Sequence, residues 1–275
     1  MTRAMGRGLA FGLLLASFTA TAGARAASND LYQAQAIVTG QGEAERARGF
    51  ALCLDDVLVK LSGDPALVGD KRLPPLEAKA GELVAAFSYR DRMSGIPVHD
   101  EQGTRERPFD LSVTFDRSKT DATLHALGLR PWLAARPRLV VVLGIRYAQT
   151  SYVLARDGER GLGQREALLA ASAKRGMPAV LPDTATLMAR GVTFETSARG
   201  RWPRLAALAR RSGGDVPLAG TLVWDEPGLG WIADWRLLWH GKAHRWHIGG
   251  VSFDDAFRNA MSGALQLVSG HGDPR

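Results

Sequence analysis

Apolar and polar residues alternate along two stretches of the first half of the chain, which is the pattern of strands with one buried face. Between them, apolar residues recur at helical spacing. The first helical stretch ends at Ser62-Gly63, where glycine suits a left-handed cap. The sequence therefore predicts the order β–α–α–β–α for this half. The predicted elements are strands at 32–38 and 109–115 and helices at 47–61, 75–87 and 118–128.

The second half opens with a continuous apolar run, Leu139-Val-Val-Val-Leu143, which is typical of a strand buried on both faces. A helical stretch separates this run from a second apolar strand, so we expect the two strands to be parallel and joined by a right-handed crossover. A strongly amphipathic helix is predicted to close the chain. The elements predicted for this half are strands at 139–143, 177–181, 218–225, 231–240 and 243–249 and helices at 164–175, 203–212 and 252–268.

These patterns predict an α/β (α+β) protein of two small units. Residues 27–135 form the β–α–α–β–α unit. Residues 136–275 form a β–α–β–α–β–β–β–α unit, with a mixed sheet covered by helices. The boundary falls between Arg130-Pro131 and Arg136-Pro137, a stretch typical of a linker.

Residues 1–26 carry the pattern of a secretory signal peptide. Arg3 and Arg7 precede an apolar stretch of about ten residues, which is too short for a spanning helix of about 20. Ala24-Arg25-Ala26 predicts cleavage after Ala26, and Ala22-Gly23-Ala24 is the alternative site. No later stretch is apolar for long enough to span a bilayer. We therefore expect an exported, periplasmic protein.

Charge and cysteine content narrow the classes of function. Loss of residues 1–26 removes three arginines and no acid, so the net charge falls from +7 to +4. This mild excess is spread along the chain and does not indicate a nucleic-acid-binding arm. A single Cys excludes an intramolecular disulfide, and 45% hydrophobic residues can supply a core instead.

A family resemblance rests on Val57-Leu-Val-Lys-Leu-Ser-Gly-Asp-Pro65, Arg136-Pro-Arg-Leu-Val-Val-Val-Leu143, Arg175-Gly-Met-Pro-Ala-Val-Leu-Pro182 and Trp235-Arg-Leu-Leu-Trp239 with Trp246. In order and spacing these stretches resemble the uncharacterised proteobacterial envelope family catalogued as domain-of-unknown-function 2066. The layout is similar, more distantly, to the N-terminal domain of TolB and to flagellar assembly protein T. Those domains are non-catalytic parts of periplasmic assemblies. The resemblance implies a fold and a compartment but no mechanism, because the family has no agreed catalytic residues.

The chain departs from this family at three places. Relatives carry acidic residues after the first buried strand and after the Leu-Pro pair, where this chain has Arg146-Tyr147 and Asp183-Thr184-Ala185. Pro217 also stands where the strand after the helix is expected to begin.

Three histidines near the C-terminus have the number but not the geometry for a zinc site. A two-residue turn at Gly241-Lys242 would place His247 opposite Arg236 and put His244 on the other face of the sheet. His240 shares a face with His247 but lies about 13 Å away, at about 3.3 Å per residue. We therefore predict no metal site.

Five tryptophans lie between residues 224 and 246. Each buries about 200 Å², so a shared core layer is favoured over an exposed stacking platform. Trp231, beside Gly228 and Gly230 at a loop edge, is the predicted exception. The side chains predicted on the buried face are Trp235, Leu237, Trp239, Trp246 and Ile248.

Arginines surround Trp202 with no acid between them, and this segment is the best candidate binding surface. It has the charge to dock an anionic glycan, lipid headgroups or an acidic protein. Alternatively, Arg204 and Arg211 lie on the solvated face of a helix that packs through Leu205 and Leu208. The candidate binding residues are Arg199, Arg201, Trp202, Arg204, Arg211 and Trp231.

Catalytic signatures are absent from the sequence. There is no G-x-S-x-G or H-E-x-x-H motif, and Gly158-x-x-Gly161-x-Gly163 matches no phosphate-binding loop. Asp55 and Asp56 point away from each other on a helix, and Cys53 is expected to be a buried apolar residue. We predict no catalytic residues and no cofactor.

The sequence favours a non-catalytic envelope module for binding or assembly. One alternative is a periplasmic hydrolase whose residues converge only in three dimensions, with His99, His125 or His244 beside an Asp. Another is a glycan- or lipid-binding protein that uses Trp202, Trp231 and the neighbouring arginines.

Overall fold

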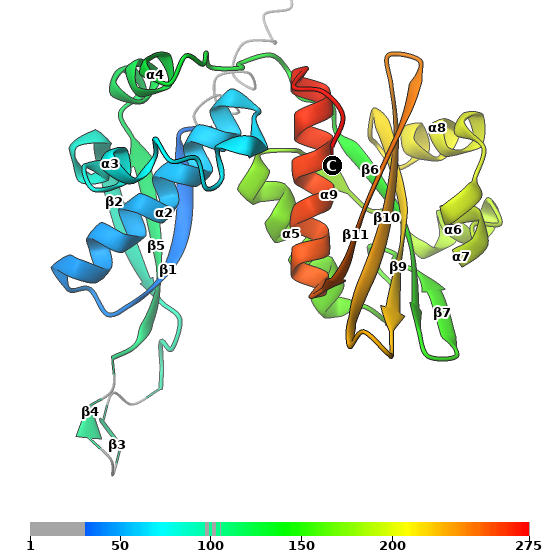
Figure 1. Ribbon diagram of the computed structural model, residues 1–275. Helices are drawn as coiled ribbons and strands as arrows, with labels where there is room; N and C mark the ends of the chain where they lie inside the picture. The colour runs from blue at the N-terminus through cyan, green and yellow to red at the C-terminus, as the bar shows by residue number, and fades with distance from the viewer. Residues whose placement is uncertain (1–30, 97–98, 101–102, 105, 275) are drawn as a thin grey trace, which may run out of the picture.

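The computed structural model describes residues 31–96, 99–100, 103–104 and 106–274. They form a protein of mixed α and β structure with one three-stranded and one six-stranded sheet, which confirms the predicted fold class (Figure 1). The predicted signal peptide lies outside the described residues. Among the described residues, no helix combines the length and apolar character needed to cross a membrane.

The first sheet is antiparallel, in the order β1-β5-β2. Strand β5 (Pro108–Phe115) buries Leu111 and Val113 under helix α2 (Glu43–Ser62), which ends at Gly63 in the left-handed conformation as predicted. The other elements here are β1 (Gln33–Thr39), α3 (Pro74–Glu77), β2 (Val84–Asp91), the short hairpin β3 (His99–Asp100) and β4 (Gly103–Thr104), and α4 (Arg117–Ala126).

The helix predicted at 75–87 is wrong. The chain forms only the single turn α3 and a 3₁₀ turn before it becomes strand β2, which pairs with β5. The apolar spacing fits a helix, but Phe87 packs edge-to-face on Phe50 of α2 at 5.2 Å. Pairing with β5 therefore overrides the local period, as tertiary context does for short segments.

The second sheet has the order β11-β10-β9-β6-β7, and β8 pairs with β6 beside β7. Strand β6 (Leu139–Tyr147) runs parallel to both β8 and β9, so the predicted parallel pair is confirmed. The other strands are β7 (Thr150–Val153), β8 (Ala179–Val180), β9 (Val216–Asp225), β10 (Gly230–Trp239) and β11 (Lys242–Val251).

Helices cover the two faces of this sheet differently (Figure 1). On the face we call the α9 face, Leu139, Val141 and Leu143 join the main core below α5 and α9. On the opposite face, the α7 face, Val140 and Val142 pack in a smaller core with α8. The helices are α5 (Leu162–Arg175), α6 (Thr184–Ala189), α7 (Phe194–Arg199), α8 (Trp202–Arg211) and α9 (Phe253–Ser269).

Strand β7 and helices α6 and α7 were not predicted. All three are short, and α6 and α7 have six residues each, which is too few to establish a helical period. Their start signals are nevertheless in the sequence, because Asp183 and Thr193 cap α6 and α7 through their side chains.

The β10–β11 turn is one residue earlier than predicted. It uses His240 and Gly241, with φ of 45° and 78°, so that Trp239 pairs with Lys242. The resulting pairing is shifted by two residues from the expected one, which leaves every side chain on its predicted face. Trp235 (1% exposed) and Trp246 (5%) are therefore buried under α9, and the predicted tryptophan core is confirmed.

The two sheets meet where α2 packs against α5. The buried carboxylate of Asp56 lies 3.0 Å from the guanidinium of Arg175 and 3.0 Å from the ammonium of Lys174. Arg136, in the predicted linker, donates to the carbonyl of Arg175 at 3.0 Å and stacks 4.5 Å over Trp132. The boundary near residue 135 stays a prediction.

Candidate functional site

Helix α7 lies directly on strand β6 because position 144 is a glycine. A Cβ added to Gly144 would lie 2.3 Å from Oγ of Ser197 and 2.9 Å from the ring of Phe194. Ser197 is fully buried, and its hydroxyl donates to the carbonyl of Phe194 at 2.6 Å. The close approach brings Arg199, the last residue of α7, over the sheet.

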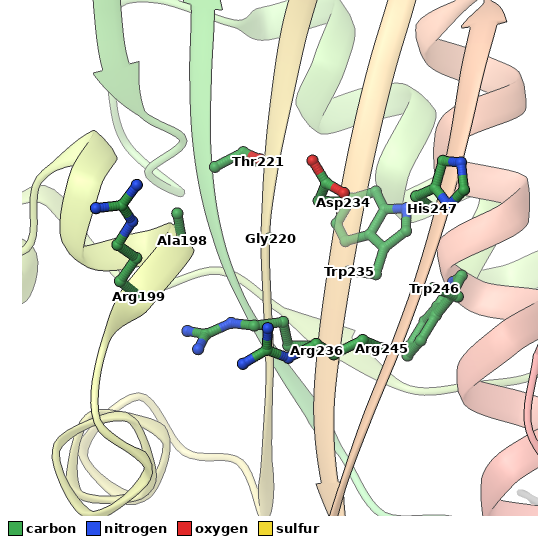
Figure 2. Close-up of a pocket in the computed structure, with 10 residues that line it drawn as sticks. All are labelled: Ala198, Arg199, Gly220, Thr221, Asp234, Trp235, Arg236, Arg245, Trp246 and His247. Atoms are coloured by element: carbon green, nitrogen blue, oxygen red, sulfur yellow. The ribbon is translucent and has the colours of Figure 1, made fainter.

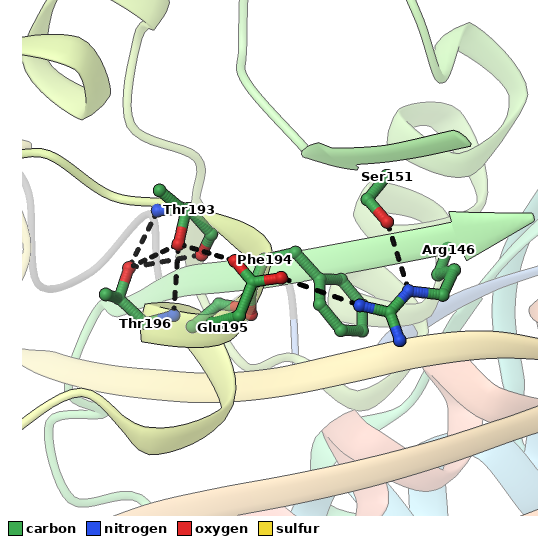
Figure 3. Close-up of polar contacts among 7 residues, drawn as sticks. Arg146, Ser151, Thr193, Phe194, Glu195 and Thr196 are labelled. Carbon is green, nitrogen blue, oxygen red and sulfur yellow. Dashed lines mark hydrogen bonds and ion pairs between the residues drawn. The ribbon is translucent and has the colours of Figure 1, made fainter. Parts of the chain in front are cut away.

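Side chains at the other end of α7 tie it to the β6–β7 hairpin (Figure 3). Arg146 stacks over the ring of Phe194 at 3.9 Å, donates from Nε to Oγ of Ser151 at 3.1 Å and pairs with Glu195 at 3.6 Å. Thr193 and Thr196 form a capping box at the start of the helix. Arg146 was noted as a departure from the resembled family, and here it anchors α7.

A pocket of about 370 Å³ lies between α7 and the α7 face of β9, β10 and β11 (Figure 2). Strand pairing aligns two rows of residues across it. Asp234 pairs with both Thr221 and His247, and Arg236 pairs with Arg245. We call this the arginine pocket. The residues that form it are Ala198, Arg199, Gly220, Thr221, Asp234, Trp235, Arg236, Arg245, Trp246 and His247.

Figure 2 shows how side chains of alternate residues separate across the sheet. Arg236 and Arg245 extend from neighbouring strands toward the same side, and Arg199 lies across the pocket from them on α7, with its side chain directed away from them. Trp235 and Trp246 turn the other way, toward α9. The strands that line the pocket on the α7 face therefore carry the buried tryptophans on their α9 face.

Arg236 is held rigidly at the centre of the pocket. Its guanidinium donates to the carbonyls of Ser197 at 3.2 Å and Gly200 at 3.3 Å, and it stacks 5.1 Å over the ring of Trp202. Burial, with a smaller contribution from the positive charge of Arg245, lowers the pKa of Arg236. Its Nε is buried without a hydrogen-bond partner.

The charge of the arginine pocket is not balanced within it. None of Arg199, Arg236 and Arg245 forms an ion pair with a carboxylate among the described residues. Asp234 is the one acid in the lining, so three arginines leave a net charge of +2 with His247 neutral. Like charges directly opposite each other on neighbouring strands, as at Arg236 and Arg245, destabilise a sheet.

The structure divides the candidate binding residues predicted from the sequence. Arg199 lines the pocket, and Trp202 supports Arg236 from beneath. Arg201, Arg204 and Arg211 are exposed along α8, and they are not among the described residues that line the pocket.

The expectation that Trp231 is exposed and available for binding is wrong. It is only 8% exposed, because its ring packs against Trp224 at 5.4 Å and Tyr147 at 6.0 Å on the α9 face. The neighbouring glycines suggested a loop edge, but Trp231 pairs directly with Trp224 on β9. Cross-strand aromatic packing therefore buries it.

Sequence reasoning missed Arg236 and Arg245. The predicted turn placed His247 opposite Arg236, and the two-residue shift replaces that pair with Arg236–Arg245 and pairs His247 with Asp234. The signal that locates the pair is the turn itself, because a glycine at the second of two turn positions with positive φ fits Gly241.

His240, His244 and His247 lie at three separate places. His240 lies in the turn, His247 lines the arginine pocket, and Nδ1 of His244 contacts Asp273 on the C-terminal tail. Among the described residues, no group of three His, Cys, Asp or Glu side chains is placed to hold a metal ion.

Helix α2 carries two groups with shifted pKa values, the buried thiol of Cys53 and the half-buried carboxyl of Asp55. Burial raises the pKa of Cys53 to about 12, which confirms its assignment as a buried residue. Burial, then the carboxylates of Glu77 and Asp56, raise the pKa of Asp55 to about 7. Both groups are on the first sheet's helix, away from the arginine pocket.

Residues 26–133 match a family model described as Domain of unknown function (DUF8605). This is not the family catalogued as domain-of-unknown-function 2066 that was expected from the sequence, and the match does not support the expected likeness to TolB or flagellar assembly protein T. The match agrees with an uncharacterised family, and none of the residues that line the arginine pocket lies within it. No curated protein matches the chain.

Proposed function

We propose that the protein is an exported, non-catalytic binding module whose arginine pocket holds an oxyanion, a phosphate or carboxylate group of its ligand. The observation that carries this proposal is that Arg199, Arg236 and Arg245 line one pocket without an ion-pair partner among the described residues. An anion at this position relieves the repulsion between the two paired arginines.

The chemistry of arginine favours this class of ligand. A guanidinium presents a planar fork that matches carboxylate and phosphate oxygens, and such charge-assisted bonds are about twice as strong as neutral ones. Two carbonyls and the ring of Trp202 already orient Arg236, so binding loses little side-chain entropy. A pocket of about 370 Å³ is at the lower end of the range for small-molecule sites.

Sequence features support the export and the non-catalytic role. Residues 1–26 have the signal-peptide pattern, which supports export to the envelope. The sequence layout, expected to resemble periplasmic assembly domains, supports the non-catalytic role. The family match over residues 26–133 supports the proposed first unit, 27–135. Export predicts that the mature protein in the periplasmic fraction begins at residue 27, which N-terminal sequencing measures.

The binding test is a calorimetric titration of the mature protein with inorganic phosphate at low ionic strength. We expect Arg199→Ala/Arg245→Ala to weaken phosphate binding by about tenfold or more, because each exposed charge pair contributes up to about 1 kcal/mol. Arg190→Ala is the matched control, since Arg190 is an exposed arginine outside the pocket lining. Equal phosphate affinity in the wild type and the double variant would overturn the proposal.

A further inference from the structure

We propose that the anionic ligand is an acidic, extended polypeptide segment that adds to β11 as a further strand. This inference rests on the proposed function, because the carboxylates of the segment would pair with Arg245, at the β11 side of the arginine pocket. It names the partner that the pocket binds.

Strand β11 is one edge of the six-stranded sheet. It has ten residues and pairs with β10 on one side only, so its outward backbone groups have no strand partner within the described part of the chain. An edge of this length is a template for an extended peptide, whose affinity then comes from main-chain hydrogen bonds. The strand has no proline to block pairing.

The charge of β11 selects the partner. The strand carries Lys242, His244, Arg245 and His247 and no acidic residue. Arg245 and His247 face the arginine pocket and are separated by two residues, about 6.6 Å along a strand. Alternate side chains of an added strand have the same spacing, so two acids at positions i and i+2 would lie opposite these two residues.

The chain itself shows that β11 binds carboxylates. On the α9 face, Asp273 of the C-terminal tail accepts from Nζ of Lys242 at 2.8 Å and contacts His244. These contacts balance the basic side chains on that face. Arg245 on the α7 face forms no such ion pair with an acid among the described residues.

The same charges argue against a second copy of this chain at the edge. Pairing of β11 with another β11 would place side by side two strands that carry basic residues and no acid, and like charges across strands are unfavourable. Charged edge strands prevent such self-pairing in many proteins. A lipid or glycan headgroup would leave the backbone groups of the edge unused.

The experiment measures binding of a fluorescent octapeptide, with glutamate and threonine alternating, by fluorescence anisotropy. We expect Arg245→Glu to weaken this binding at least tenfold, because it replaces an attraction by a repulsion. A matching peptide with lysine in place of glutamate should bind Arg245→Glu more tightly than it binds the wild type. Arg190→Ala is the control and should bind the glutamate peptide as the wild type does.

Backbone methylation tests strand addition on the unaltered protein. Of two peptides methylated on the odd or the even backbone nitrogens, only one set directs its N–H groups to β11. We therefore expect one methylated peptide to lose at least tenfold in affinity and the other to bind nearly as well as the parent. Equal binding of both methylated peptides and the parent overturns the inference.

Further outcomes separate this inference from the proposed function. If inorganic phosphate or anionic lipid vesicles bind the wild type but not Arg199→Ala/Arg245→Ala, while the glutamate peptide does not bind, the pocket is an anion site and the peptide inference is wrong. If none of the three probes binds, both proposals are wrong.

Discussion

The two faces of the β10–β11 hairpin have opposite chemistry although the same two strands build both. On the α9 face, Trp235 and Trp246 are paired and sealed beneath the last helix. On the α7 face, one position along, Arg236 and Arg245 are paired and border an open pocket. The apolar face therefore provides the rigid support on which the charged face is displayed.

The difference between the faces follows from their covering helices. Helix α9 supplies Phe257 at 6.4 Å from Trp235, and Gly263 lets it approach the ring of Trp246 closely. Helices α7 and α8 pack mainly on β6 and β9, so the α7 face of β10 and β11 stays partly open. Stability and binding should consequently depend on different side chains of one hairpin.

The largest effect should come from the α9 face. Trp235→Ala is expected to lower the free energy of unfolding by about 3–5 kcal/mol, because the removed ring leaves a cavity in a closely packed core. Urea unfolding followed by tryptophan fluorescence and circular dichroism measures this change. Arg245→Ala, on the other face, should change stability by less than about 0.5 kcal/mol. Equal losses in the two variants would contradict the division of roles.

The next largest effect should come from Gly144 of β6, where a substitution should lower both stability and phosphate affinity. Gly144→Ala is expected to destabilise the protein by about 1–3 kcal/mol, because the added methyl collides with Ser197 and Phe194 of α7. Displacement of α7 also moves the carbonyls that orient Arg236, so phosphate affinity should fall as well. Thermal unfolding and calorimetry measure the two changes.

A suitable control is Gly163→Ala in α5, where an added Cβ meets nothing within 4 Å. It should be neutral or stabilising by up to about 1 kcal/mol, because glycine costs helix stability. If Gly144→Ala and Gly163→Ala change the free energy of unfolding by the same amount, then the close packing of α7 on β6 is not the reason that position 144 requires glycine.

A third effect concerns Asp55 of α2, whose titration should change the stability of the protein but not anion binding in the arginine pocket. The pKa of Asp55 is about 7 in the folded protein and about 3.9 in an unfolded chain. The folded state thus holds an extra proton in this interval, and stability should fall as pH rises from about 4 to about 7.

The variant Asp55→Asn removes this dependence. At pH 8 it should be more stable than the wild type by about 1–2 kcal/mol, a value reduced for solvent screening of a half-exposed group, and at pH 4 the two should be alike. Urea unfolding across pH measures this. A wild-type advantage at pH 8 would show that Asp55 is stabilised as a carboxylate.

The smallest effect should come from the α7 face. Trp202→Leu removes the ring below Arg236 and should weaken phosphate binding about threefold, from a cation–π contribution of about 0.5–1 kcal/mol. Arg211→Ala, at the far end of α8, should leave phosphate affinity unchanged. If Arg211→Ala has the larger effect, the binding surface is the one first predicted along α8.

Several elements could be predicted from the sequence because their signals are local. The buried run of β6, the left-handed cap at Gly63 and the amphipathic period of α9 each specify an element without reference to the rest of the fold. The faces of β10 and β11 were predicted as well, even with a misplaced turn, because side chains alternate with a period of two.

Elements that depend on distant partners were not predicted. Phe87 is in a strand because β5 and Phe50 are beside it, although its apolar spacing fits a helix. The arginine pocket is similar, since Arg199 and Arg236 are brought together by the seat of α7 on Gly144, and only Arg199 was a candidate. Neither short helix has enough residues for a period.

The sequence by itself determined the fold class, most of the strands and long helices, and the burial of the tryptophan layer. Each of these depends on periodic burial along one segment, which neighbouring residues encode. Only the tertiary structure decided the strand of Phe87, the burial of Trp231 and the meeting of three arginines in one pocket. Contacts of that kind join residues that are far apart in the chain or on separate strands, and their partners are set by register and by helix packing.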